Sequence, residues 1–152
     1  MKHITLYLRV IIALGLLGLA DSLYLTYQHY SDVIPPCSVN PLIDCGKVLG
    51  SQYATIYGVP LALLGAMHYA VLTGLMGASL YLQNVRIFQF GLAQSFIGAV
   101  ISAYLVYLQI GVLSAICLFC MGSAIISFTL FVCAVSAYRT YEHSKTRPQS
   151  IS

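Results

Sequence analysis

The chain has 152 residues, of which 59% are hydrophobic and 7% are charged, and its mean hydropathy is +0.86. Too few charged side chains are present to cover a water-soluble domain, so the composition excludes that class and indicates an integral membrane protein. We therefore expect membrane lipid around the chain, and we expect no nucleic-acid partner.

Four apolar segments are each long enough, at about 20 residues, to cross a bilayer as a helix. In chain order they lie near residues 6–27, 58–82, 87–109 and 115–138. A long loop at residues 28–57 joins the first two. The sequence therefore predicts an all-α fold, an integral membrane four-helix bundle in which residues 1–152 form a single domain.

The basic residues are distributed unevenly among the connections. Six of the seven lie at the chain ends and in the second connection: Lys2, Arg9, Arg86, Arg139, Lys145 and Arg147. The seventh, Lys47, lies in the long loop. The positive-inside rule then places both termini in the cytoplasm, and the long loop and the start of the fourth helix outside.

The first segment has a second interpretation, because Met1-Lys2-His3 followed by apolar residues is also typical of a secretory signal peptide. The apolar run from Ile4 to Ala20 exceeds the usual length of about 7 to 15 residues, and it lacks a clean A-x-A cleavage site. We therefore favour a membrane helix.

Asp21, His68 and Gln94 are candidates among the polar residues inside the predicted helices. Asp21 lies in the first, and an ionisable group within a membrane is a functional candidate. For His68 and Gln94, in the second and third helices, packing with satisfied hydrogen bonds is expected.

Two cysteines three positions apart, Cys117 and Cys120, stand at the start of the fourth apolar segment. Residues i and i+3 of a helix share a face, so these thiols need little adjustment to form a disulfide. Free N–H groups and the macrodipole stabilise a thiolate at a helix start. The intervening Leu118 and Phe119 suit contact with an apolar ligand. Cys133, deeper in the segment, is expected to be an inert thiol.

A second pair, Cys37 and Cys45, lies in the long loop with seven residues between its members. Such a link can close into a disulfide and reopen, and Asp44 is expected either to tune the Cys45 thiol or to cap a short helix. A mobile pair beside a fixed pair is the layout of a relay, in which a thiolate attacks the neighbouring disulfide. Purely structural disulfides and a zinc site are the competing interpretations. No suitably spaced histidine lies nearby, and we expect no metal.

Further short segments accompany the four cysteines. In chain order the set comprises Ser22-Leu23-Tyr24, Cys37 and Cys45, Lys47-Val48-Leu49, Ser51, Tyr53-Ala54-Thr55, Gly58-Val59-Pro60, and Cys117 with Cys120. In this order the chain resembles the vitamin K epoxide reductase family, as a bacterial single-domain member, over nearly its whole length.

The resemblance implies how electrons would move. Cys37 and Cys45 would exchange with a separate extracytoplasmic thioredoxin-fold (DsbA-like) partner, Cys117 would accept electrons from the loop pair, and Cys120 would react with a quinone. The partner would be oxidised and the quinone reduced to quinol, which drives disulfide formation in secreted proteins. The expected location is the bacterial inner membrane.

The resemblance also implies that the four helices surround the quinone, ubiquinone or menaquinone, with the extracytoplasmic loop capping the site. Ser51 matches the family serine near the quinone head group, and we expect Phe119 to contact the quinone as well. Animal members have a tyrosine four residues after the second cysteine of the CxxC pair, where this chain has Ala124. The resemblance therefore does not extend to vitamin K epoxide as a substrate.

Two alternatives stay open. The DsbB type of oxidase performs similar chemistry, but its CxxC pair precedes its wider pair, the reverse of the order here. A non-catalytic membrane assembly or binding protein would use its cysteines as structural disulfides, which would be indifferent to quinone.

Overall fold

The computed structural model of the protein describes residues 2–31, 36–37, 40 and 42–146. Its long helices are α1 (Lys2–Tyr30), α3 (Leu61–Leu82), α4 (Val85–Tyr107) and α5 (Leu118–Thr146). Shorter elements lie between them: α2 (Cys45–Leu49), β1 (Thr55–Ile56), β2 (Val59–Pro60) and the π-helix η1 (Leu108–Leu113). Residues 32–35, 38–39 and 41 of the predicted redox loop lie outside the described residues.

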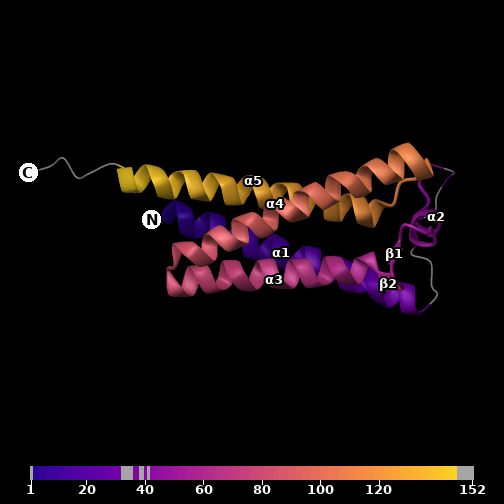
Figure 1. Cartoon of the computed structure of the whole chain (residues 1–152), viewed down its shortest axis with the longest axis horizontal. Coiled ribbons are helices and arrows are strands. Elements are labelled where there is room, and N and C mark those ends of the chain that lie inside the picture. Colours follow the sequence, from indigo (N-terminus) through magenta and orange to yellow (C-terminus); the bar gives the residue numbers. More distant parts are fainter. Residues whose placement is uncertain (1, 32–35, 38–39, 41, 147–152) are drawn as a thin grey trace, which may run out of the picture.

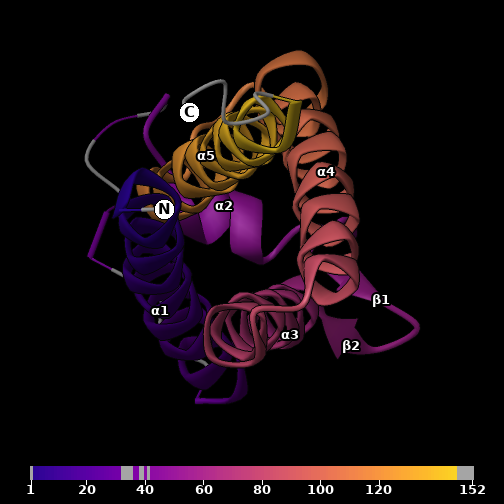
Figure 2. The same cartoon turned by 90° about the vertical axis from the view of Figure 1, so that its left-hand side faces the viewer.

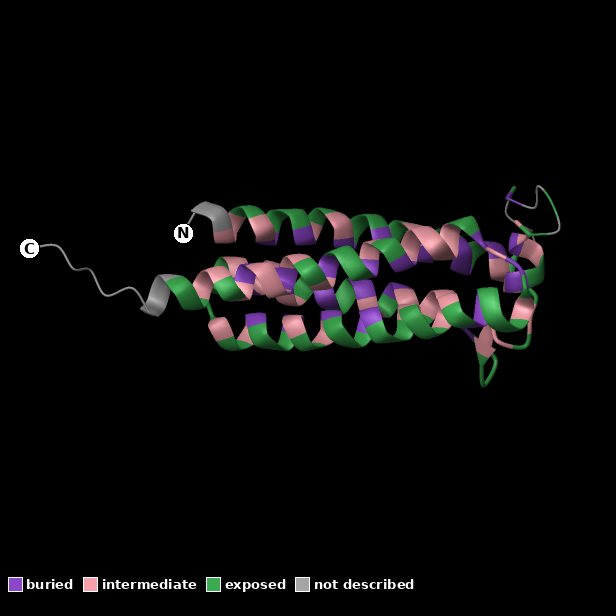
Figure 3. Ribbon diagram, turned by 90° about the horizontal axis from the view of Figure 1, so that it is seen from above, coloured by how far each residue is buried: buried purple, intermediate pink, exposed green. Residues whose placement is uncertain are grey.

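Four segments of the described chain are long and apolar enough to cross a membrane, by length and composition. They are Ile4–Tyr30, Leu61–Leu82, Val85–Leu113 and Leu118–His143. Figure 3 shows exposed residues along the outer faces of the helices. The exposed large hydrophobic side chains include Leu17, Phe90, Phe96 and Val132. Such faces suit contact with lipid, so the prediction of an all-α membrane bundle is confirmed.

The long helices lie side by side along one axis (Figure 1). Seen from the end, they follow one another around a ring in the order α1, α3, α4, α5 (Figure 2). Helix contacts follow the same order, and α5 closes the ring against α1. The two-residue link of Gln83 and Asn84 makes α3 and α4 antiparallel neighbours, and the Asn84 side chain caps α4 by accepting a hydrogen bond from the Arg86 N–H at 2.9 Å.

The main hydrophobic core lies between α1, α3, α4 and α5. Its buried members are Leu8, Ile11, Tyr69, Leu72, Met76, Phe88, Leu130, Ala134 and Ala137. Glycines let the helices approach closely: a Cβ at Gly18 would overlap the Tyr69 ring, and one at Gly91 would overlap Met76. Small residues at helix crossings are the usual means of packing in membranes, where apolar burial alone favours no contact between helices.

The second long helix begins later than the sequence predicted. The predicted start is residue 58, whereas α3 begins at Leu61. Tyr57 and Gly58 have positive φ angles of 51° and 81° and form the turn between β1 and β2. Positive φ at both central positions is the requirement of a type I′ hairpin turn. The hairpin thus uses residues that the prediction assigned to the helix.

The other helix ends also differ from the predicted ranges. The first extends beyond 6–27 at both ends, and the third continues beyond residue 109 as η1 before stopping at Ser114, whose φ of 48° is left-handed. The fourth begins at Leu118 instead of residue 115. Ile116 lies outside that helix because its backbone pairs with Ile43 of the loop.

The loop elements cover one end of the bundle, opposite both chain termini (Figure 1). This end carries α2 and the β1–β2 hairpin, and Lys47 is exposed there. Toward the other end lie the arginines Arg9, Arg86 and Arg139. Arg147 lies outside the described residues. Positive charge in the described part of the chain therefore gathers away from the loop.

Candidate active site

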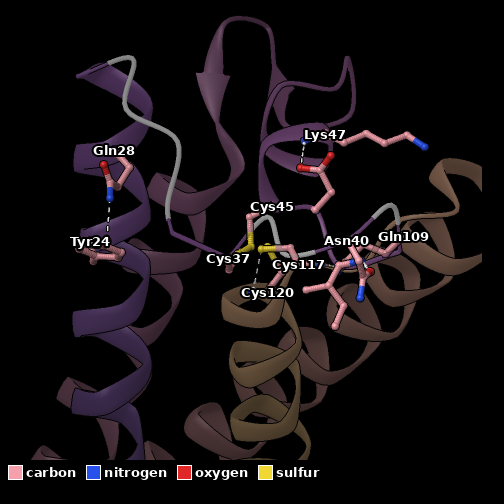
Figure 4. Close-up of a disulfide and its surroundings, with 11 residues drawn as sticks. Tyr24, Gln28, Cys37, Asn40, Cys45, Lys47, Gln109, Cys117 and Cys120 are labelled. Atoms are coloured by element: carbon pink, nitrogen blue, oxygen red, sulfur yellow. Dashed lines mark hydrogen bonds between the residues drawn. A yellow bond between two sulfur atoms is a disulfide. The ribbon is translucent and has the colours of Figure 1, made fainter.

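Cys37 and Cys45 form a disulfide in the loop that covers the bundle (Figure 4). Their Cα atoms are 5.6 Å apart, and the two residues are only 4% and 0% exposed. Cys45 is the first residue of α2, and Asp44 accepts a hydrogen bond from the Lys47 N–H at 3.1 Å. The predicted capping of a short helix by Asp44 is confirmed.

The sulfur of Cys117 lies beside this disulfide. Its Sγ atom and the two disulfide sulfurs all lie within 4.8 Å of one another. Backbone hydrogen bonds hold the two segments together: the Ile116 N–H donates to the Leu42 carbonyl at 2.7 Å, and the Asp44 N–H donates to the Ile116 carbonyl at 3.1 Å. A thiol and a disulfide from distant parts of the sequence thus lie within reach of exchange.

Cys117 occupies the N-cap position of α5. The helix begins at Leu118, and the Cys120 N–H donates to the Cys117 Sγ at 3.3 Å. The pKa of Cys117 is lowered chiefly because the Cys120 side chain hydrogen bonds to it, with the backbone N–H groups of Cys120 and Phe119 adding to this effect. Burial and the negative charge of Asp21 partly oppose the shift. A stabilised thiolate is the nucleophile that disulfide exchange requires.

Gln109 supports the same segment from η1. Its side-chain Oε1 accepts a hydrogen bond from the Cys117 N–H at 2.8 Å, and the residue is 3% exposed. The Ala115 N–H donates to the Gln109 carbonyl at 3.0 Å. From the sequence, Gln109 was expected only as a helix boundary, and its contact with Cys117 was not predicted. A lone amide side chain at the end of an apolar run was the available signal.

A cavity of about 540 Å³ lies below the loop and between the long helices. Its lining is mostly apolar and comes from α1, α2, the hairpin, α3, α4, η1 and α5. Cys120 lines the cavity, whereas Cys117 is fully buried beside the loop disulfide. The CxxC pair therefore joins a disulfide on one side to an apolar cavity on the other.

Two further residues were expected at this cavity. Ser51 lines it, and its hydroxyl donates a hydrogen bond to the Val48 carbonyl at 2.8 Å. Phe119 is not among the lining residues. Its ring instead packs against Tyr24 of α1, with a centroid distance of 5.3 Å, and it borders the core around the loop disulfide. The described geometry thus brings Ser51 and Cys120, but not Phe119, to the cavity.

Comparison with known proteins agrees with this arrangement of cysteines. Residues 9–135 match the vitamin K epoxide reductase family. The chain belongs to the vitamin K epoxide reductase family. It is also 34% identical over 131 residues to a protein of Arabidopsis thaliana, thiol-disulfide oxidoreductase LTO1. That match covers 80% of this chain and 34% of the plant protein, so the chain spans about a third of its relative's length.

Segments that carried the family resemblance meet at the cavity. Ser22 of α1 lines it together with Pro60 and Ala124. Ser22 is 4% exposed, and its backbone carbonyl accepts a hydrogen bond from the Thr26 hydroxyl at 2.7 Å. Tyr24 does not line the cavity; its hydroxyl accepts a hydrogen bond from the Gln28 Nε2 at 2.6 Å (Figure 4).

The polar residues predicted inside the helices have different surroundings. Gln94 Nε2 lies 3.0 Å from His68 Nδ1, so these two side chains form the expected kind of hydrogen bond. The other ring nitrogen, His68 Nε2, is buried and has no hydrogen-bond partner among the described residues. Asp21 Oδ2 is likewise buried and unpartnered within the described chain. The expected hydrogen bond is therefore present for His68 and Gln94, and one ring nitrogen of His68 is left without a described partner.

Cys37, Cys45 and Cys117 are also the group of potential metal ligands found in the described part of the chain. Metal ions bind thiolates, and the disulfide consumes two of the three sulfurs. In this oxidation state the geometry suits sulfur exchange better than tetrahedral coordination.

Proposed function

We propose that this protein is a membrane thiol–disulfide oxidoreductase that oxidises a thioredoxin-fold partner and reduces a quinone to quinol. The observation that carries the proposal is the double placement of the CxxC pair. Cys117 Sγ lies within 4.8 Å of both loop sulfurs, while Cys120 lines the apolar cavity. Family membership and the name of the Arabidopsis relative support thiol–disulfide chemistry.

Electrons enter at the loop. A thiolate of the partner attacks the Cys37–Cys45 disulfide and forms a mixed disulfide, which the partner's second thiolate then resolves. The partner leaves as a disulfide, and the loop pair becomes a dithiol. The close approach of the loop segment to residue 116 keeps this pair beside Cys117.

Transfer to the helix pair repeats the same exchange. A loop thiolate attacks Cys117 of a Cys117–Cys120 disulfide, and the thiolate of Cys120 leaves. The second loop thiolate then resolves the mixed disulfide, which restores the Cys37–Cys45 bond. The described structure corresponds to the state after this step, with the loop pair oxidised and Cys117 and Cys120 free.

Quinone reduction completes the cycle. Cys117 and Cys120 give up two electrons and two protons as their disulfide forms, and the quinone gains two of each to become quinol. Cys120 is the member of the pair with access to the cavity. The mostly apolar lining excludes water and suits a hydrophobic quinone such as ubiquinone or menaquinone.

The location we propose is the bacterial inner membrane, with the loop end outside the cytoplasm. Supporting this orientation, Arg9, Arg86 and Arg139 lie away from the loop, and basic residues favour the cytoplasmic side. Disulfides also form and persist in an oxidising compartment, which the extracytoplasmic space supplies.

The test is quinone reduction by the purified protein in detergent, with dithiothreitol as the electron donor and a short-chain ubiquinone as acceptor. Wild type should reduce the quinone, Cys120→Ala should fall to the background rate, and Cys133→Ala should keep wild-type activity. Cys133 is the matched control because it is a free cysteine of the same helix that does not line the cavity. A folded wild type that reduces neither ubiquinone nor menaquinone would favour the structural-disulfide alternative.

A further inference from the structure

One residue that lines the cavity carries a buried nitrogen without a described partner. His68 lines the cavity from α3, and its Nε2 atom has no hydrogen bond among the described residues. Buried polar atoms in folded proteins nearly always have a partner, and an exception calls for an explanation. A ligand that fills the cavity is one way to satisfy this atom.

The hydrogen bond at the opposite ring nitrogen determines whether Nε2 is a donor or an acceptor. Gln94 Nε2 lies 3.0 Å from His68 Nδ1, and an amide nitrogen can donate but cannot accept. In this orientation of the Gln94 amide, His68 Nδ1 is the acceptor and carries no hydrogen. A neutral imidazole with an unprotonated Nδ1 bears its hydrogen on Nε2, so Nε2 is a donor.

The absence of a side chain at Gly98 leaves room for the imidazole ring. Gly98 also lines the cavity, and a Cβ at that position would overlap the His68 imidazole at Nε2. Gly98 lies one helical turn beyond Gln94 on α4, so a single helix face both orients the imidazole and makes space for it. Gln94 and Gly98 of α4 thus both position the His68 side chain of α3.

Several hydroxyl groups of the lining are already engaged. The Tyr69 hydroxyl lies 2.8 Å from both the carbonyl and the hydroxyl of Ser123, and 2.9 Å from the Ser127 hydroxyl. The Ser51 hydroxyl donates to Val48. His68 Nε2, by contrast, is a buried atom without an acceptor among the described residues.

We propose that His68, oriented by Gln94, donates a hydrogen bond from Nε2 to a carbonyl oxygen of the quinone in this cavity. The inference rests on the function proposed above. A quinone presents two carbonyl acceptors and no donor, so it complements an imidazole N–H in an apolar site. Reduction increases negative charge on the oxygen, so the bond strengthens as electrons arrive and stabilises the transition state.

The first measurement is infrared spectroscopy of quinone labelled with carbon-13 at the carbonyl groups and bound to the wild-type protein. A hydrogen bond weakens a C=O bond, so one carbonyl band should lie at lower wavenumber than in an alkane solvent. His68→Leu should move this band back to the alkane position, and His68→Gln should partly restore it because an amide also donates. Two alkane-like carbonyl bands in the wild type would overturn the inference.

Kinetics give the second measurement, with dithiothreitol as donor. His68→Leu and Gln94→Leu should raise KM for the quinone about tenfold, the loss expected for one hydrogen bond. Gln89→Leu is the matched control, since Gln89 is an exposed glutamine of the same helix. Gly98→Ala should also raise KM, whereas Gly74→Ala should not, because a Cβ at Gly74 meets no atom within 4 Å.

The outcomes separate the two proposals. If the wild type neither binds nor reduces quinone, the proposed function fails and the inference about His68 fails with it. If the wild type reduces quinone while folded His68→Leu and His68→Gln keep its KM and carbonyl bands, the function stands and the role of His68 is refuted. Retention of the Cys37–Cys45 disulfide and the melting temperature report folding of each variant.

Discussion

At the scale of single residues, Cys117 combines two roles that are usually separate. It caps α5 by accepting the Cys120 N–H, and it lies within 4.8 Å of both loop sulfurs. The helix start supplies N–H groups that stabilise negative charge on sulfur, which favours the thiolate. A thiol can thus be fully buried and still have a lowered pKa, because the helix start and not water stabilises its negative charge.

Asp21 opposes this activation, which gives a prediction with a defined sign. Its negative charge raises the pKa of Cys117, so Asp21→Asn should lower that pKa. The pH profile for alkylation of Cys117 by iodoacetamide, followed by mass spectrometry, should move to lower pH in the variant. Cys133 provides the internal control, about 20 Å from Cys120 at 1.5 Å per helical residue. An unchanged Cys117 profile would contradict the electrostatic link.

At the scale of secondary structure, the start of α5 is set by pairing with the loop. Ile116 bonds to Leu42 and Asp44, and the helix begins only two residues later. Gln109 completes the arrangement by accepting the Cys117 N–H at 2.8 Å. An extended segment, a π-helix and a short capped helix therefore fix two cysteine pairs without a covalent link between them.

Replacing Gln109 tests this arrangement. Gln109→Leu leaves the buried Cys117 N–H without its acceptor, which should cost about 1–3 kcal/mol of unfolding free energy. Exchange between the loop pair and the helix pair should also become slower, because Cys117 would be less firmly placed. Unfolding in increasing denaturing detergent measures the first effect and rapid acid quenching measures the second. Equal stability and exchange rate in Gln109→Leu and the control Gln89→Leu would show that Gln109 does not position Cys117.

At the scale of the whole molecule, the main hydrophobic core and the cavity lie at different positions along the bundle axis. The main hydrophobic core includes Leu8, Met76 and Ala137, whereas the cavity is lined by residues closer to the loop, such as Ser51 and Cys120. The packed part maintains the helix positions, which leaves the loop end able to carry an open site. Apolar outer faces along the helices suit lipid throughout.

Membrane orientation can be tested with introduced cysteines in the Cys133→Ala background. Ile56→Cys lies in the loop hairpin and Leu82→Cys at the end of α3 nearest the termini, and both native side chains are exposed. In intact bacterial cells whose outer membrane is permeable to it, a membrane-impermeant maleimide should label Ile56→Cys and should reach Leu82→Cys only after lysis. The reverse pattern would invert the proposed topology.

Much of this architecture follows from local sequence. Helix existence depends on runs of apolar residues, which are visible without any tertiary contact. The predicted starts of α3 and α5 were less accurate. Tyr57 adopts a positive φ, which tyrosine seldom does, and Ile116 pairs with Ile43, which is distant in the sequence. Phe119 was expected at the quinone, but its direction on the helix depends on packing against Tyr24.

The sequence by itself determined that the chain lies in a membrane, how many long helices it has and which four cysteines are proposed for the chemistry. Composition, the length of apolar runs and cysteine spacing can all be read without tertiary contacts. Tertiary structure decided which sulfur meets which, with Cys117 facing the loop disulfide and Cys120 facing the cavity. It also decided that His68 joins Gln94 beside Gly98. The physical reason is that such contacts depend on how four helices are rotated against one another, and apolar faces that look alike in sequence do not specify that rotation.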